Sequence, residues 1–126
     1  KPQPARKFDE YGTLKTVDLH SRLDNYAIQL QNEPGSQGYV ITYGGKTSTP
    51  TAAKTASTKA WKWLVETRGL DGSRIVQIDG GYREKPTTEL WIVPYDGTPP
   101  TATPTVEPSE VKPPKKTARK KTTKKK

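Results

Sequence analysis

The sequence predicts an α/β sandwich in which two helices pack on one face of a single sheet. Two observations lead to this class. Two stretches with helical spacing of apolar residues alternate with stretches rich in β-branched and aromatic residues, and a further strand-like stretch follows. The expected order is β-α-β-α-β-β, and it closes near Gly97. The 126 residues of the chain are enough for one such domain and little more.

The first half of this unit is expected to hold a strand, a helix and a second strand. Residues 8–14 predict a short first strand. From Asp18 the spacing becomes helical, and the helix is expected to stop before the breaker pair Pro34 and Gly35. Its apolar stripe consists of Leu19, Leu23, Ala27 and Leu30. Residues 39–43 are β-branched and aromatic, which is typical of a buried strand.

The second half is expected to hold a helix and two strands. Ser48 or Thr49 can cap the helix, and Gly69 is a natural stop. The apolar stripe of this helix consists of Ala53, Ala56, Ala60 and Leu64. Residues 74–78 and residues 88–93 then predict the last two strands.

Outside this unit the composition changes abruptly. Residues 1–7 are a basic lead-in that is expected to be flexible, and residues 98–111 are a Pro/Thr-rich linker expected to be semi-extended. Residues 112–126 form a Lys-rich tail, which is expected to be disordered and to bind anions. Its cations are Lys112, Lys115, Lys116, Arg119, Lys120, Lys121, Lys124, Lys125 and Lys126.

Most of the positive charge belongs to this C-terminal part. Residues 98–126 hold nine Lys or Arg against two Glu, a net charge of +7. Residues 1–97 hold 13 Lys or Arg against 11 Asp or Glu, a net charge of +2. The domain is therefore near neutral, and any binding to a polyanion is expected from the tail.

The residue inventory excludes several classes of site. The absence of cysteine excludes disulfides, thiolate zinc sites and cysteine nucleophiles, and a single histidine cannot supply a metal cluster. His20 and Asp24 lie four apart on a helix, but no nucleophile completes a reaction centre with them, so a surface pair is the simpler interpretation. The sequence therefore predicts no enzyme, no catalytic or metal-binding residue and no cofactor.

The sequence also bears on membranes and export. No stretch approaches the roughly 18 to 20 apolar residues of a transmembrane segment, so none is expected. The chain begins with Lys1 rather than methionine, which favours removal of a secretory signal, with trimming as the alternative.

The stretch GGKTSTP follows the second predicted strand and is a candidate anion site. Lys46 and the hydroxyls of Thr47 and Ser48 can meet an anion at a helix N-terminus, where free N–H groups point outward. A P-loop is excluded because its first glycine position is occupied by Val40. The alternative is a solvated turn that caps the helix.

Two other features supply candidate contact residues. The glycine turn at residues 79–84 lies beside a strand end, a common place for binding groups, and contributes Tyr82 and Arg83. Trp61 and Trp63 are two apart on the predicted helix, so their side chains diverge by about 200° and cannot both face the sheet. In the last predicted strand, alternation places Trp91 on the face opposite Leu90 and Ile92. The expected contact surface is Trp61 and Trp91, with satellite packing as the alternative.

Several stretches together follow a known family pattern. They are Phe8 with Asp9, then RLDNYAIQLQNEP, YVITYGG and AWKWLVETRGLDGSRI, and then the closing strand. In this pattern the sequence resembles the OmpA-like domain, which binds peptidoglycan at the C-terminus of outer-membrane and motor proteins. The resemblance covers about residues 8–93 and implies an OmpA-like β-α-β-α-β-β fold in a protein of the periplasm or cell envelope.

The chain departs from this family at the charged residues of its ligand pocket. By counting, the aspartate position falls on Gly45 or Lys46, the arginine position on Ala56, and the paired arginines near Pro86 and Thr87. A zwitterionic amino acid needs oppositely charged hydrogen-bonding partners. We therefore expect weak or no binding of diaminopimelate through that pocket.

Two functions fit these observations. The first is a non-catalytic cell-envelope binding or anchoring module, whose tail binds an anionic polymer or surface (a cell-wall component or lipid head groups) or an acidic protein. The second is a nucleic-acid-associated protein, because Lys-rich tails bind phosphate backbones without sequence preference. The resemblance of the domain favours the first function, whereas the tail alone favours the second.

Overall fold

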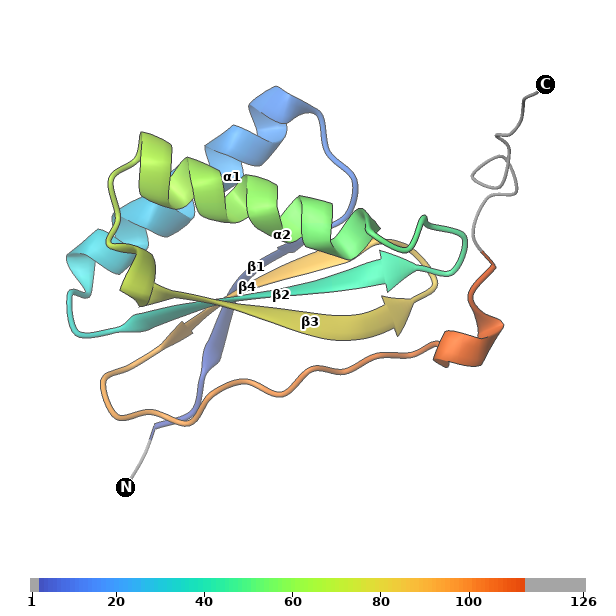
Figure 1. Ribbon diagram of the computed structural model, residues 1–126. Helices are drawn as coiled ribbons and strands as arrows, with labels where there is room; N and C mark the ends of the chain where they lie inside the picture. The colour runs from blue at the N-terminus through green and yellow to red at the C-terminus, as the bar shows by residue number, and fades with distance from the viewer. Residues whose placement is uncertain (1–2, 113–126) are drawn as a thin grey trace.

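A computed structural model describes residues 3–112 of the chain (Figure 1). The main elements are β1 (Arg6–Tyr11), α1 (Thr16–Asn32), β2 (Gln37–Gly45), α2 (Ala52–Lys62), β3 (Ile75–Arg83) and β4 (Thr87–Val93). A π-helical turn at Trp63–Thr67 extends α2, and single 3₁₀ turns occupy Gly72–Arg74 and Pro108–Glu110. The chain thus combines two helices with one mixed sheet, the α/β class that the sequence predicts. Residues 113–126, most of the predicted tail, lie outside the described residues.

The sheet has the strand order β1-β4-β2-β3. β2 and β3 are parallel, whereas β4 is antiparallel to both of its neighbours, β1 and β2. The first strand of the chain therefore pairs with the last one. Because parallel strands end at the same edge of a sheet, the C-terminal ends of β2 and β3 lie side by side.

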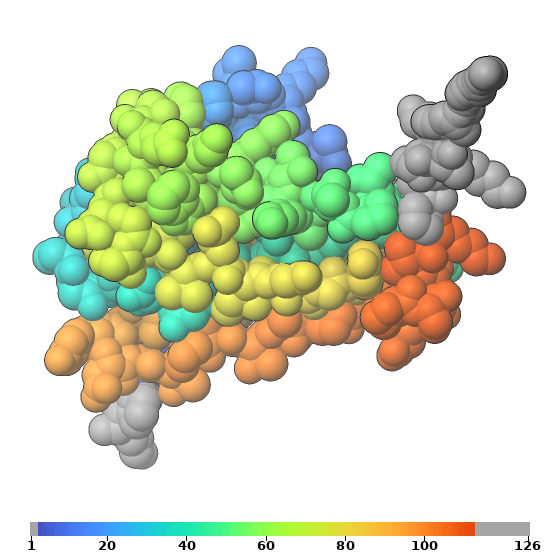
Figure 2. All heavy atoms as spheres, in the orientation of Figure 1, coloured from blue at the N-terminus to red at the C-terminus, as the bar shows by residue number. Residues whose placement is uncertain are grey.

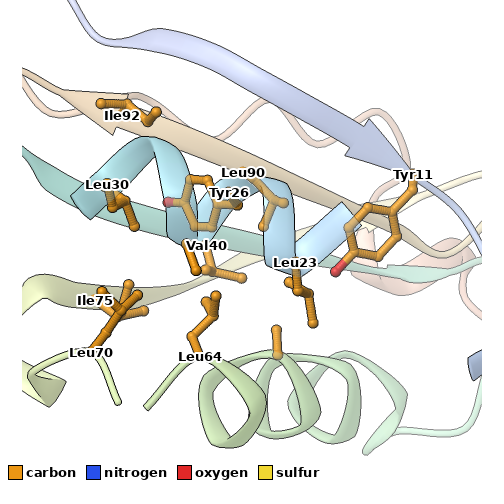
Figure 3. Packing of buried hydrophobic residues seen from close by; sticks show 12 residues of the cluster. Tyr11, Leu23, Tyr26, Leu30, Val40, Leu64, Leu70, Ile75, Leu90 and Ile92 are labelled. Carbon is orange, nitrogen blue, oxygen red and sulfur yellow. The ribbon is translucent and has the colours of Figure 1, made fainter. Parts of the chain in front are cut away.

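Both helices cover the same face of the sheet, and the core lies between them (Figure 1). Figure 3 shows Leu23, Tyr26 and Leu30 of α1 close to Val40 and Leu90 of the sheet. All five side chains are fully buried, and each contributes roughly 1.5–3 kcal/mol by leaving water. The Tyr26 hydroxyl donates a hydrogen bond to the carbonyl oxygen of Trp91 over 2.6 Å, so this polar group is buried together with a hydrogen-bond partner.

The start of α2 differs from the sequence-based expectation. The helix begins at Ala52, and Thr51 stands at its N-cap without a side-chain capping bond. Ser48, one of the two expected caps, instead accepts a hydrogen bond from the Gly45 N–H through its Oγ (3.0 Å). The hydroxyl closes the turn after β2. Neither Ser48 nor Thr49 caps the helix, because both lie before the N-cap position, and Thr49 contributes only its carbonyl oxygen, which accepts from the Ala52 N–H. The end of the helical segment at Gly69 is as expected, since this glycine has a left-handed φ of 78°.

Residues 98–112, which we call the strap, lie on the face of the sheet that the helices leave open (Figure 1, orange). The N–H groups of Thr105 and Val106 both donate to the carbonyl oxygen of Tyr82, and Val106 is only 5% exposed. At its ends, Thr98 N–H donates to Gln3 O and Lys112 N–H donates to Lys46 O, both over 2.8 Å.

The strap corresponds to the predicted linker, and it is extended as that composition implies. It does not stand away from the domain, however. The open face of the sheet carries Ile41 and Tyr43, and both are at most 1% exposed once the strap is in place. Burial of this apolar surface explains why the segment follows the sheet.

Candidate functional site

The parallel pairing of β2 and β3 brings together two stretches that the sequence singled out separately. Gly44 pairs with Tyr82 and Gly45 with Arg83. Just beyond, the Lys46 N–H donates to the carbonyl oxygen of Glu84 over 3.2 Å. The GGKTSTP loop and residues 79–84 are therefore neighbours at one end of the sheet. The prediction of a glycine turn at residues 79–84 is wrong, because β3 continues to Arg83 and the glycines sit at an irregularity of the β2–β3 pairing.

The GGKTSTP loop offers fewer free groups than its sequence suggests. Ser48 both accepts from the Gly45 N–H and donates its own N–H to the Gly45 carbonyl (3.1 Å), so it is used within the turn. Thr47 is exposed, and Lys46 is half-buried with its ammonium group in no ion pair among residues 3–112. The loop retains one ammonium, that of Lys46, and two exposed hydroxyls, those of Thr47 and Thr49, that can meet an anion.

Arg83 and Tyr82 are engaged by the protein itself. The Arg83 guanidinium lies 3.8 Å from the centre of the Tyr43 ring and crosses to the strap side of the sheet. There its Nη2 donates to Glu89 (2.8 Å) and to the Thr103 hydroxyl of the strap (2.6 Å). The carbonyl oxygen of Tyr82 accepts hydrogen bonds from the backbone N–H groups of Thr105 and Val106 in the strap. The Arg83 guanidinium is therefore occupied, whereas only the backbone of Tyr82 is engaged and its half-buried side chain is not.

Glu89 is the centre of a buried polar cluster that the sequence analysis did not single out. Besides Arg83, it accepts hydrogen bonds from Trp91 Nε1 (3.0 Å) and from the Tyr43 hydroxyl (3.1 Å), and it is 3% exposed. Burial alone would raise the pKa of Glu89, but the hydrogen bonds of its three donors outweigh it and hold the pKa below the usual value. The carboxylate is therefore ionised at neutral pH. Its hydrogen bonds join side chains of β2, β3 and β4 on the face of the sheet that the helices leave open.

A signal for this cluster was present in the sequence. In the stretch TELWIV, alternation places Glu89 and Trp91 on one face of a strand and Leu90 and Ile92 on the other. A carboxylate beside a tryptophan on a sheet face indicates a polar contact there. The partners from β2, β3 and the strap could not be inferred, because they depend on the strand order.

A cavity of about 350 Å³ lies on the helix side of the sheet, near the same end. Most of its lining is small and apolar or carries a hydroxyl, and Lys59 is its only charged residue: Tyr11, Gly12, Thr13, Leu14, Leu19, Tyr43, Thr49, Ala52, Ala53, Thr55, Ala56, Lys59, Pro86, Thr87 and Thr88. Burial raises the pKa of Tyr11 to about 12, so its hydroxyl stays protonated. The cavity suits a small ligand that brings few charges.

The positions counted from the sequence converge on this cavity. Ala56, Pro86 and Thr87 all line it. Gly45 lies beside them, since a Cβ built on it would stand 2.6 Å from Pro86 Cδ. Residues that are distant in the sequence thus lie in or beside one pocket, and none of these four carries a charge. Lys46, the other residue counted for the aspartate position, does not line the cavity and has the opposite charge.

The tryptophans do not form a common surface. Trp61 and Trp63 are half-buried on the helix side and pack against the core, while Trp91 contacts Glu89 on the strap side.

The predicted pair His20 and Asp24 meets at Trp63. The histidine ring stacks on the indole, with ring centres 3.5 Å apart, and Asp24 accepts a hydrogen bond from the Trp63 Nε1 at 2.7 Å. Hydrogen bonds from Arg68, and then from Trp63, hold the pKa of Asp24 below its usual value.

Two classes of site find no support within residues 3–112. No helix there has the length and apolar character needed to cross a membrane. In the same part of the chain, no three His, Asp or Glu side chains are grouped so that they could hold a metal ion. Comparison with known proteins adds no assignment, because no protein-family model and no curated protein matches the chain.

Proposed function

We propose that this chain is a non-catalytic binding module of the periplasm or cell envelope, and that it docks on an anionic polymer or surface through its Lys-rich tail. The observation that carries the proposal is the partition of cations. The arginines of the domain are engaged, as Arg83 is with Glu89 and Arg68 with Asp24. The nine cations of residues 112–126 have no acidic residue among them in the sequence.

The position of the strap supports this function. Because Lys112 is held to the carbonyl oxygen of Lys46, the cationic tail begins at a fixed point on the folded domain. A polyanion captured by the tail is therefore brought to one end of the sheet. A linker that stood free in solution would give no such control over position.

We also propose that the domain is OmpA-like. The element order and the placement of both helices on one face are what that resemblance implies. The convergence of Gly45, Ala56, Pro86 and Thr87 on one cavity supports it further, because these positions were counted independently as the charged sites of the family pocket. Since the counted positions hold no acid at Gly45 or Lys46 and no arginine at Ala56, Pro86 or Thr87, we expect the cavity to hold diaminopimelate weakly or not at all.

The proposal does not include catalysis. Glu89, the one buried carboxylate among residues 3–112, is held ionised by three donors and cannot act as a proton donor near neutral pH. His20 is stacked on Trp63. Neither group faces a nucleophile, so neither has the geometry of general acid–base catalysis.

The test compares the full chain with a variant in which the nine tail cations are changed to glutamine. Binding to an anionic polymer is expected to disappear in the variant and to weaken steeply with salt in the natural chain. On duplex DNA, used as a reference polyanion, the log–log salt slope would approach about −8 if all nine charges were engaged. A tail of shuffled sequence is the matched control and should bind as well as the natural one. Full affinity in the glutamine variant would move the binding site from the tail to the domain.

A nucleic-acid-associated protein is the second candidate, favoured by the Lys, Pro, Thr and Ala composition of the tail. The two candidates differ in where the protein acts. Fractionation of cells that produce the full-length gene product separates them: recovery with the envelope supports the first function, and recovery with the nucleic acid supports the second.

A further inference from the structure

We propose that the outer face of α2 is a second contact surface for the polymer bound by the tail, and that this polymer is a flexible single chain of phosphodiesters. The proposal rests on the proposed function and adds a folded surface to it. Three observations support it: the charge of α2, the place where the tail begins, and the shape of the free face.

The charge of α2 is entirely positive. The helix contains three lysines and no acidic residue. Its outer side carries a shallow groove lined only by lysine and threonine: Thr51, Lys54, Thr55, Thr58, Lys59 and Lys62. No salt bridge among residues 3–112 involves any of these lysines. Three ammonium groups and three hydroxyls therefore face solvent on one helix, and both groups hydrogen-bond phosphate oxygens.

Some lysines outside α2 have an acid close by in the sequence. At the end of the sheet, Lys85 follows Glu84 directly and Lys112 follows Glu110 by two residues, although neither lysine is in a salt bridge within residues 3–112. Around α2 the nearest acids lie at the flanks. Asp79 lies with Lys54 at a neighbouring pocket, and Glu66 is four residues beyond Lys62. The groove itself is lined by no acidic residue.

The strap ends near the N-terminal end of this groove, so the tail begins there. The Lys112 N–H donates a hydrogen bond to the carbonyl oxygen of Lys46, in the connection that leads into α2. Figure 2 shows the red-orange end of the strap at the same end of the molecule as the start of α2. The groove is about 17 Å long, at 1.5 Å per residue. The 14 residues beyond Lys112 can span up to about 48 Å. One polymer chain can thus meet both sets of cations, and the second contact forms at high effective concentration.

The shape of the surface argues for a single flexible chain. α2 packs on β2 and β3, so only its outer side is free, whereas a helix that enters the major groove of a duplex is surrounded by it. A bilayer is favoured by apolar side chains that insert below the head groups. The large exposed apolar residues among the described ones are Val17, Ile28 and Tyr95, and none of them is on α2.

The experiment measures binding of the full chain to poly(glycerol phosphate) over a range of salt concentrations. The test variant is Lys54→Gln with Lys62→Gln, and the matched control is Lys15→Gln with Lys85→Gln. All four side chains are exposed, and thermal melts check that both variants fold. If two phosphate contacts are lost, the log–log salt slope should fall by about 1.4, which at 0.1 M salt is a roughly 25-fold loss of affinity. The control should change far less.

Each other outcome separates this proposal from the function on which it rests. Equal losses in the two variants would mean that only net charge matters, which overturns the α2 surface. Loss of binding on neutralising the tail, with no effect at α2, overturns the α2 surface and leaves the proposed function intact. Unchanged binding after the tail is neutralised overturns the proposed function. An α2 effect that is equally large on duplex DNA or on phosphatidylglycerol vesicles overturns the choice of a flexible single chain.

Discussion

Glu89 and Arg83 show how one buried ion pair can organise a whole face of a sheet. Arg83 joins β3 to the carboxylate on β4 and to Thr103 of the strap. A buried pair of this kind adds little net stability relative to apolar residues, but loss of one partner is costly because the other charge remains buried. The Arg83 side chain is only 16% exposed, so it has little water to turn to.

We predict that Glu89→Ala lowers the free energy of unfolding by about 3 kcal/mol, because it removes the buried partner of Arg83 and leaves that guanidinium only the longer contact with Glu10 at 3.6 Å. Glu33→Ala is the control outside the cluster, since Glu33 pairs with Arg6 near the surface and such pairs contribute about 1 kcal/mol or less. Urea denaturation at pH 7 measures both. Equal effects of the two changes would contradict the role of the cluster.

The same pair predicts a pH dependence with a definite sign. The pKa of Glu89 in the folded state lies below its unfolded value, near 4.5. Its stabilisation is therefore complete above that value and is lost as the pH falls through the folded pKa. The difference in stability between the natural chain and Glu89→Ala should shrink as the pH is lowered below about 4.5. A difference that stays constant to pH 3 would show that the carboxylate acts through packing alone.

The helices and strands could be predicted from the sequence more completely than the contacts between them. The apolar spacing of α1 and the breaker after it locate that helix, and the aromatic and β-branched run at residues 39–43 locates the middle of β2. The strap is different. Its single buried apolar side chain, Val106, gives no periodicity, so local sequence indicates an extended segment but not its docking.

The candidate site was predictable only in parts, for a related reason. Lys46, Tyr82 and Arg83 were found from glycine turns and charges, which are local signals. Their proximity follows from the parallel pairing of β2 with β3, and the burial of Arg83 follows from the strap. Both depend on contacts between distant parts of the chain, which residue patterns do not record.

At the element scale, we predict that Thr103→Val loosens the strap. The change removes the hydroxyl that accepts from Arg83, and a hydrogen bond to a charged group contributes about 1.5–3 kcal/mol. The amides of Thr105 and Val106 should then exchange with solvent at least about tenfold faster in hydrogen-exchange measurements. Thr101→Val, at an exposed position of the same segment, should leave both rates unchanged. Similar rates in the two variants would mean that Thr103 does not hold the strap.

Contacts between the N-terminal and C-terminal parts of residues 3–112 hold the fold together. β1 pairs with β4, and Thr98 of the strap is bonded to Gln3, just before β1. We therefore predict that residues 3–112 unfold in one cooperative step. Tryptophan fluorescence reports on both faces of the sheet, through Trp63 and Trp91, and far-UV circular dichroism reports on the helices. The two thermal transitions should coincide. Two separate midpoints would show that the strap side melts independently of the helix side.

The pairing of β1 with β4 also sets the order in which the protein can be completed. Among the strands of residues 3–112, β1 is synthesised before the others, yet its neighbour in the sheet, β4, is synthesised after them. Until β4 has been made, a nascent chain holds a strand with apolar residues Phe8 and Tyr11 and no edge to receive it. Contacts this distant in sequence slow folding, and unpaired strands invite aggregation. The growing chain therefore depends on late folding, in which β4 enters between β1 and β2 before the strap settles over the sheet.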